Sequence, residues 1–250
     1  MKSIVSRFRL LAILVAPLLL SDPLHALPVR VLAWDAEIAA MRLALVDSKG
    51  STPIDAMHPS KRTRIYQITT GEKPVVLEAL DRKGADGKAC TSEVKIPEGT
   101  KNPLIVILPD ANAAGVRAFV MEDDVSNFAW GSTRFINATN RELVFESEKK
   151  TLALPASWNP VQADPGGETR NVEVKFFFHD EPARPFYSGI WEYNSEVRML
   201  VFLVPCVDSQ LASGVDPRSG PISVKMIPED RRLMKQGAPN AAGKKKASKP

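Results

Sequence analysis

The sequence contains few of the residues that enzymes use for chemistry. Its 250 residues include two cysteines and three histidines, and one of the histidines, His25, lies in the N-terminal segment. There is no G-x-S-x-G, H-E-x-x-H or G-x-G-x-x-G motif and no phosphate-binding P-loop. A Ser-His-Asp triad can still assemble from distant residues, but no serine stands out as its nucleophile. The hydrolases, metalloproteases, dinucleotide enzymes and NTPases that carry such motifs are therefore disfavoured.

Apolar runs long enough to span a bilayer are also absent. Residues 10–20 form an apolar block that Pro17 interrupts, and they follow the basic residues Lys2, Arg7 and Arg9. This block is shorter than the roughly 20 residues of a membrane-spanning helix. A basic start, an apolar core and a small residue at Ala26 are typical of an export signal. We predict a signal peptide over residues 1–26, with a retained anchor as the alternative, and a mature protein without a transmembrane segment in the periplasm or outside the cell.

Net positive charge is confined to the two ends of the chain. Residues 231–250 carry +7 and residues 1–26 carry +2, so the formal net charge of +4 leaves −5 for residues 27–230. The basic residues of the tail are Arg231, Arg232, Lys235, Lys244, Lys245, Lys246 and Lys249. An acidic body argues against a nucleic-acid-binding domain. The tail lacks aromatic and β-branched residues, so we predict that it is disordered; it is either simply solvated or a tether to an anionic surface.

Two apolar runs indicate an internal repeat. Residues 102–110 and 196–206 are short apolar blocks, and each is followed by a second strand-like segment with an acidic end, at 116–124 and 222–230. Other strand-like segments recur at intervals of about ten residues, as in β-sandwiches and barrels. The chain also has 20 prolines against 14 glycines, which favours many short elements over long helices. We therefore predict an all-β chain.

The repeat divides the body into two modules. We place the first at residues 27–124, a connector at 125–131 and the second at 132–230, followed by the tail at 231–250. Each module has about 100 residues, the usual size of an immunoglobulin-like sandwich, although the Cys…Trp…Cys pattern of antibody domains is missing.

The openings of the two modules are V-R-V-L-A-W-D and T-R-F-I-N-A-T-N. They resemble those of uncharacterised exported bacterial β-sandwich proteins of the immunoglobulin-like kind. The resemblance extends over most of residues 27–230 as a pattern of strands, without a diagnostic motif. It implies two tandem antiparallel β-sandwich modules, and it assigns no catalytic or binding residue.

The segment of residues 35–47 fits two patterns. Ile38, Met41 and Leu45 share a helical face, whereas Met41, Leu43 and Leu45 alternate as they would on a strand. A charged residue falls between the apolar positions, and the D-S-K-G sequence at the end of the segment is typical of a turn. We predict a strand here.

The two cysteines, Cys90 and Cys206, permit one intramolecular disulfide, which an oxidising compartment would allow. It would join a loop of the first module to a strand end of the second. Sequence does not give the Cα distance that such a bridge requires, so two unpaired thiols remain the alternative. Neither cysteine has a histidine nearby in the sequence, which disfavours a nucleophilic role.

Three acidic groups could in principle hold a metal ion. Residues 179–181 (H-D-E) could supply two ligands from one strand face, or they could form a polar turn. Residues 123–124 and 229–230 could chelate Ca²⁺ between the modules, but no Asp-x-Asp-x-Asp-Gly loop accompanies them. We interpret these pairs as solvated strand ends, and we expect neither a metal nor a cofactor.

An aromatic group supplies the candidate ligand site. Tyr187, Trp191 and Tyr193 would lie on one face of a strand, unless the glycine between them marks a bulge. Exposed rings can stack on sugars, and Glu192 and Asn194 could bond their hydroxyl groups. The alternative is that Trp191 belongs to a core or to the contact between modules.

Trp130 and Trp158, which lie near loop-like segments, are secondary candidates for ligand contact. These features together predict an exported, non-enzymatic binding or structural protein of the cell envelope. Its expected partner is a polysaccharide or another envelope protein. The alternative function is hydrolysis of an extracellular polymer by carboxylates that the sequence does not identify.

Overall fold

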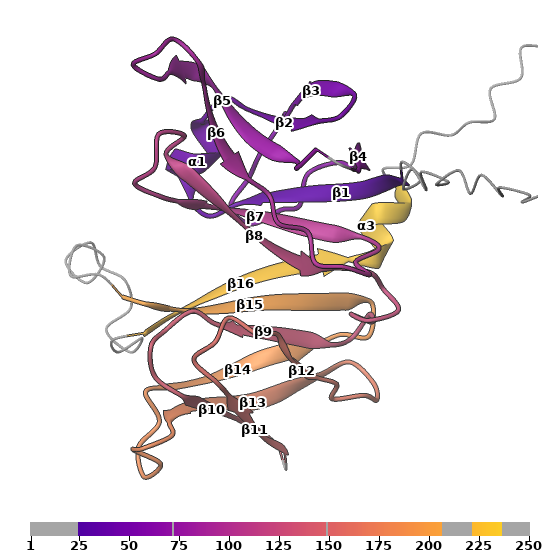
Figure 1. Cartoon of the computed structure of the whole chain (residues 1–250). Coiled ribbons are helices and arrows are strands. Elements are labelled where there is room, and N and C mark those ends of the chain that lie inside the picture. The colour runs from indigo at the N-terminus through magenta and orange to yellow at the C-terminus, as the bar shows by residue number, and fades with distance from the viewer. Residues whose placement is uncertain (1–24, 72, 149, 207–221, 237–250) are drawn as a thin grey trace, which may run out of the picture.

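The computed structural model describes residues 25–71, 73–148, 150–206 and 222–236 (Figure 1). This part of the chain is all-β, with sixteen strands and two short helices. None of the described helices is both long and apolar enough to cross a membrane. Residues 1–24 of the predicted signal peptide (1–26) and the tail beyond residue 236 lie outside the described residues, whereas His25 and Ala26 begin the first strand.

The first module consists of two four-stranded sheets around a common core. The inner sheet has the order β4 (Tyr66–Thr70), β1 (His25–Ala33), β7 (Pro103–Pro109) and β8 (Val116–Glu122). The outer sheet has the order β3 (Gly50–Pro53), β2 (Leu43–Asp47), β5 (Val76–Lys83) and β6 (Ala89–Glu93). Buried side chains of both sheets form one hydrophobic cluster, including Val31, Leu45 and Ile105. Two sheets that enclose one core are the layers of a sandwich.

The second module repeats this plan. Its inner sheet has the order β12 (Val161–Ala163), β9 (Thr133–Asn137), β15 (Val197–Pro205) and β16 (Ile222–Asp230). Its outer sheet has the order β11 (Lys150–Leu154), β10 (Leu143–Ser147), β13 (Arg170–Phe178) and β14 (Tyr187–Tyr193). A second cluster, rich in phenylalanine, fills the space between these two sheets.

The strand order of the two modules is identical when eight is added to each strand number. The repeated apolar runs are β7 and β15, and the segments that follow them are β8 and β16. Our expectation of purely antiparallel modules is wrong at one pair in each, because β1 runs parallel to β7 and β9 runs parallel to β15. A parallel pair needs a long crossover connection, and here the five strands between the partners supply it, four of them in the outer sheet.

The two inner sheets pack face to face, so the molecule has four layers of sheet. On β7, Ile105 points into the core of the first module, whereas Leu104 and Val106 join a third cluster with Leu200 and Phe202 of β15. Figure 1 shows β7, β8, β15 and β16 at the junction of the modules. Strands that are buried on both faces have continuous apolar sequences, which explains why these two runs are the most apolar of the body.

A short helix interrupts the segment that we predicted as one strand. Residues 36–40 form α1 (Ala36–Ala40), and β2 begins only at Leu43. Asp35 caps the helix because its Oδ1 accepts a hydrogen bond of 2.8 Å from the backbone N of Ile38. Ile38 is buried against the first core. The helical alternative was therefore right for α1, and the strand prediction was right for β2.

The predicted disorder of the tail is wrong for its first six residues, which form α3 (Arg231–Gln236). The backbone N of Arg231 donates to the carbonyl O of Glu196 at 2.9 Å, and the backbone N of Arg232 donates to Asp230 Oδ1 at 2.8 Å. These bonds attach the start of α3 to the end of β16 and to the turn before β15. The sequence did not predict this helix, because Leu233 and Met234 are too few to form a helical apolar pattern among the charged residues.

Candidate functional site at the junction of the modules

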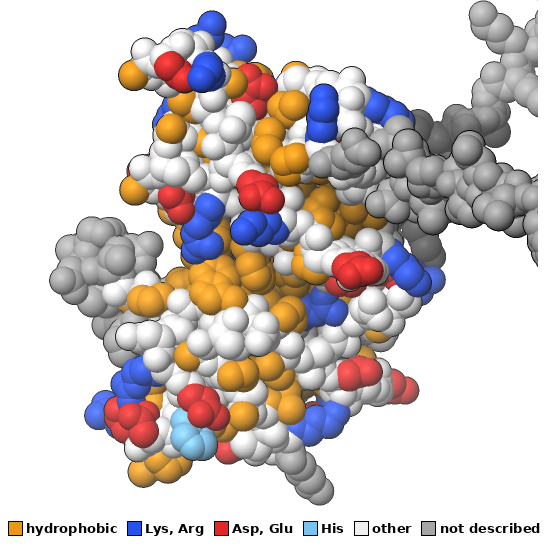
Figure 2. Space-filling view, viewed as in Figure 1, with side chains coloured by type: hydrophobic (Ala, Val, Ile, Leu, Met, Phe, Trp, Pro, Cys, Tyr) orange, Lys and Arg blue, Asp and Glu red, His pale blue; other side chains and the backbone are white. Residues whose placement is uncertain are grey.

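The interface between the two inner sheets is apolar along most of its length. Its buried residues are Leu32, Leu104, Val106, Leu108, Met121, Phe128, Ile136, Leu200, Phe202 and Ile227. Figure 2 shows hydrophobic side chains along the waist between the modules. At one end of this inter-module interface the apolar side chains give way to charged ones.

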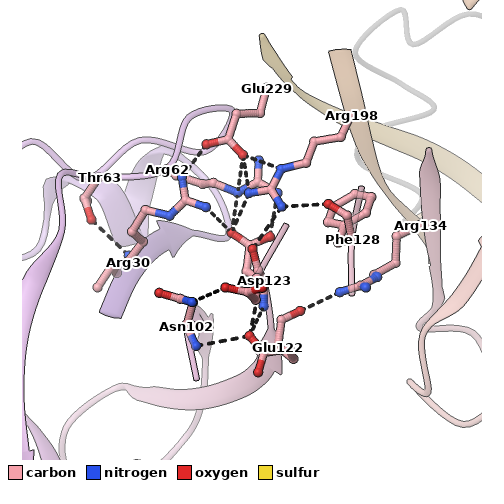
Figure 3. A network of polar contacts seen from close by, with 12 residues as sticks. Arg30, Arg62, Thr63, Asn102, Glu122, Asp123, Phe128, Arg134, Arg198 and Glu229 are labelled. Atoms are coloured by element: carbon pink, nitrogen blue, oxygen red, sulfur yellow. Dashed lines mark hydrogen bonds and ion pairs between the residues drawn. The ribbon is translucent and has the colours of Figure 1, made fainter. Parts of the chain in front are cut away.

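Three arginines and two carboxylates meet at that end, and we call them the arginine cluster (Figure 3). Asp123 accepts hydrogen bonds from Arg62 Nε at 2.9 Å and from Arg62 Nη2 at 3.1 Å, and it also pairs with Arg30. Glu229 accepts a bond of 2.7 Å from Arg198 Nε and pairs with Arg30 as well. Arg30 and Arg62 come from the first module, whereas Arg198 and Glu229 come from the second. The cluster therefore joins the modules electrostatically.

Strand alternation explains how the sequence brings these side chains together. Arg30 lies two residues before Leu32, which faces the interface from β1. Arg198 likewise lies two residues before an interface residue of β15. Asp123 lies two residues after an interface residue of β8, and Glu229 lies two residues after one of β16. Residues at a spacing of two share one face of a strand. The arginine cluster thus extends the apolar interface faces of β1, β8, β15 and β16 with charged residues.

The connector between the modules is held by two arginines. Arg198 Nη1 donates to the carbonyl oxygens of Asp123 at 2.9 Å and Phe128 at 3.1 Å. Arg134 on β9 donates to the carbonyl O of Asn127 at 2.7 Å, and its guanidinium lies 4.3 Å from the centroid of the Phe128 ring. These contacts fix the path of residues 123–128 against β9 and β15.

Two opposing effects set the protonation of Asp123. Its side chain is only 1% exposed, and burial alone would raise the pKa of its carboxyl group. The attraction of Arg62, Arg198 and Arg30 outweighs burial and holds this pKa below its ordinary value of 3.8. Asp123 is therefore ionised at neutral pH.

This lowered pKa predicts an acid-sensitive interface. The stabilisation by Asp123 is present above the pKa of the unfolded chain and is lost as the pH falls through the lower folded pKa. We expect the contribution of Asp123 to the free energy of unfolding to be constant between about pH 7 and 5 and to decline below about pH 4. Denaturant unfolding of the wild type and of Asp123→Asn across this range measures it. Parallel pH profiles of the two proteins would contradict the assignment.

Two adjoining cavities flank the arginine cluster, and we call them together the interface groove. Their volumes are about 390 and 550 Å³, and both are lined by Arg30, Ile65 and Met234. Val125 lines the smaller cavity and Leu233 lines the larger one. Of the six large hydrophobic side chains that are exposed in the described ranges, these four surround the groove: Ile65 at 56%, Val125 at 46%, Leu233 at 65% and Met234 at 47%. Both modules and α3 thus contribute to its walls.

Of the secondary candidates, Trp130 lines the smaller cavity, where the Arg198 guanidinium lies 5.1 Å from its ring centroid. Trp158 lies at the aromatic end of the inter-module interface. Its ring centroid is 5.1 Å from Phe119, 6.3 Å from Trp34 and 6.5 Å from Phe202. Trp158 therefore serves packing between the modules, whereas Trp130 is available to the groove.

The aromatic residues predicted from the sequence share one face of β14 and are half-buried. Trp191 packs on the second core, with ring centroids 5.8 Å from Phe176 and 6.3 Å from Phe145, and its Nε1 donates to Tyr187 Oη at 2.9 Å. Tyr193 also packs against that core. The structure therefore brings the three rings together, on the side of the strand that faces the core.

Glu192 is exposed on the other face of β14, and Asn194 follows the strand, where its Oδ1 accepts a bond of 3.0 Å from the backbone N of Glu196. Glu192, Asn194, Trp191 and Tyr193 line a cavity of about 50 Å³. Typical ligand pockets occupy roughly 300–1,000 Å³. Sugar stacking on these rings stays a prediction, with the interface groove as the larger site.

The acidic pairs that we interpreted as solvated strand ends are in part buried. Asp123 is 2% exposed, and it holds arginines together with Glu229 between the modules. In residues 179–181, Asp180 and Glu181 pair with Arg141 at 2.6 and 2.8 Å on the surface. Within the described ranges, no three His, Cys, Asp or Glu side chains gather as the ligands of a metal ion would.

The two cysteines belong to different modules. Cys90 lies on β6 and is buried in the first core, whereas Cys206 directly follows β15 of the second module and is half-buried. A disulfide between them stays a prediction that the redox form of the purified protein tests.

Comparison with known proteins does not assign the chain to a family. No protein family matches the chain, and no curated protein matches it either. Among solved structures, the chain is similar to a "putative cell adhesion protein" from Bacteroides eggerthii, with 9% sequence identity over 84% of this chain and 97% of that one. The TM-score of this match is 0.18.

Proposed function

We propose that the chain is a non-enzymatic binding protein of the cell envelope and that it binds its partner in the interface groove. The gathering of four exposed hydrophobic side chains around one groove carries this proposal. Exposed apolar side chains scattered singly are ordinary, whereas a contiguous group marks a binding surface. The groove is complete only when the two modules are held together, which is what the arginine cluster does.

The chemistry of the groove favours binding over the alternative, hydrolysis. Its buried carboxylates, Asp123 and Glu229, are both held by arginines, and the lowered pKa of Asp123 leaves it without a proton to donate at neutral pH. His58 and His179 are exposed, and neither lines the groove. These observations support a site that recognises its ligand without transforming it.

Location outside the cytoplasm is part of the proposal, and the basic and apolar pattern of residues 1–26 supports it. The basic residues of the tail beyond α3, Lys244, Lys245, Lys246 and Lys249, would add a salt-sensitive attraction to anionic polymers of the envelope. A polysaccharide remains one candidate partner, through Trp191 and its neighbours on β14.

Site-specific photo-crosslinking in the cells of origin tests the groove. We expect a photoreactive amino acid at Ile65 or at Leu233 to form a defined adduct, recovered outside the cytoplasm, because both side chains are exposed at the groove. Ile190 is the matched control, since it is apolar and 73% exposed on β14, away from the groove. Adducts at Ile190 alone, or at none of the three positions, would reject the groove as the binding site.

A further inference from the structure

The arginine cluster carries one positive charge more than its own carboxylates can balance. Three guanidinium groups, those of Arg30, Arg62 and Arg198, contact two carboxylates, those of Asp123 and Glu229. The side chain of Arg62 is 3% exposed. Its Nη1 is the buried side-chain atom that finds no hydrogen-bond partner among the described residues. Buried charges are normally paired, so the cluster lacks one anionic partner within the described part of the chain.

This excess charge belongs to the wall of the groove. Arg30 and Arg62 line the larger cavity, and Lys61 lines it as an exposed residue that forms no ion pair with the residues the structure describes. The acidic residues of the same wall are engaged, Glu229 by Arg198 at 2.5 Å and Asp230 by Arg232 at 2.6 Å. A concave site with an excess of one sign of charge concentrates ligands of the opposite sign. The wall therefore attracts anions although residues 27–230 carry −5.

Part of the wall of the larger cavity is apolar. Ile65, Leu233 and Met234 line it beside the basic residues. A volume of about 550 Å³ is within the range of small-molecule sites. The chain's own tail does not suit this wall, because Lys244, Lys245, Lys246 and Lys249 have the same sign of charge.

We propose that the interface groove takes a monomeric amphiphile with one oxyanion head, a carboxylate or phosphate ester, and an unbranched apolar chain. The head lies at Lys61 and the guanidinium wall of Arg30 and Arg62, and the chain lies on Leu233 and Met234. This assignment of a ligand class rests on the proposed function of the groove. Each methylene that the groove removes from water strengthens binding about fourfold.

Three probes separate the two halves of the proposed ligand. Octanoate has both the oxyanion and the chain, octan-1-ol has the chain alone, and acetate has the oxyanion alone. By isothermal titration calorimetry of the purified protein, we expect octanoate to bind saturably and at least about tenfold more tightly than either other probe. The difference in affinity between octanoate and octan-1-ol should become smaller at high salt, because salt screens the charge of the wall.

Exposed positions test the site without threatening the fold. We expect Leu233→Ser combined with Met234→Ser to weaken octanoate binding about tenfold and Lys61→Gln to weaken it about threefold. The matched controls Ile190→Ser and Lys88→Gln should leave it unchanged, because both residues are exposed and outside the groove. Arg62→Met should remove the advantage of octanoate over octan-1-ol. If that variant does not fold, the exposed variants decide the question.

Several results would overturn the ligand class. These are no octanoate binding, equal affinity for octan-1-ol and octanoate, or octanoate binding that the groove variants leave unchanged. A crosslinked adduct at Ile65 or Leu233 together with any of these results would retain the groove as the binding site and reject the amphiphile. Absence of both adduct and octanoate binding would reject the groove itself.

Discussion

Replacing Asp123 with asparagine is expected to lower the free energy of unfolding by about 3–5 kcal/mol at neutral pH. The side chain of Asp123 is 1% exposed and contacts Arg30, Arg62 and Arg198. Asparagine keeps the shape of the side chain but removes its charge. Three guanidinium groups then remain in a buried cluster with Glu229 as their only contacting carboxylate among the described residues. Removing one partner of a buried ion pair costs far more than the pair itself contributes.

Urea or guanidinium unfolding at pH 7 measures this loss, and Asp124→Asn is the matched control. Asp124 is the next residue, and its carboxylate accepts bonds from Ser126 and Asn102 near the surface instead of contacting arginines. We expect this variant to change stability much less than Asp123→Asn. Equal effects of the two substitutions would mean that the arginine cluster does not hold the modules together.

Phe202→Ala, in the apolar part of the inter-module interface, is expected to lower the free energy of unfolding by about 3–5 kcal/mol. Phe202 is fully buried on β15, and its ring centroid lies 5.4 Å from that of Trp34 across the interface and 6.5 Å from that of Trp158. Truncation removes apolar contacts from both modules and leaves a cavity between two sheets. Packed sheets close such cavities only in part.

Ile190→Ala is the control for this substitution, because Ile190 is 73% exposed and its truncation should change stability by less than about 0.5 kcal/mol. The slope of the unfolding free energy against denaturant gives a second readout, since it scales with the surface exposed on unfolding. A slope typical of one module, or a small effect of Phe202→Ala, would show that the modules unfold independently.

The all-β fold could be predicted from the sequence because its most apolar segments are strands that are buried on both faces. β7 and β15 are continuous apolar runs since each lies between a module core and the inter-module interface. Their recurrence made the repeat visible, and the observed strand order repeats as well. The parallel pairs of β1 with β7 and of β9 with β15 could not be predicted, because the pattern of a short strand does not specify the direction of its neighbour.

The arginine cluster could not be found by reading along the chain. Asp123 and Glu229 have the local sequence of solvated strand ends, whereas the side chains that bury and pair them lie far away in sequence. Arg198 is 75 residues from Asp123, and Arg30 is 199 residues from Glu229. One signal was present: a charged residue at a spacing of two beyond an apolar stripe, repeated in several inner strands. This signal could have been interpreted only by comparing the corresponding strands of both modules.

For the aromatic residues of β14, the sequence predicted which side chains share a face but not whether that face is exposed. Alternation correctly grouped Tyr187, Trp191 and Tyr193 on one face of β14, because residues at a spacing of two share a face whatever surrounds them. The pattern did not say whether that face meets water or a core. The phenylalanines of β10 and β13 decide this, through contacts that form only when the sheet closes over β9.

The face-to-face contact of the two inner sheets uses corresponding strands of the repeat: β1, β7 and β8 meet β9, β15 and β16. Like surfaces that meet in this way are the hallmark of an isologous dimer. The chain is thus organised like an isologous dimer whose two halves are joined in one polypeptide. Among the described residues α3 follows only the second half, so the repeat is broken at the groove, where α3 contributes Leu233 and Met234 to the wall.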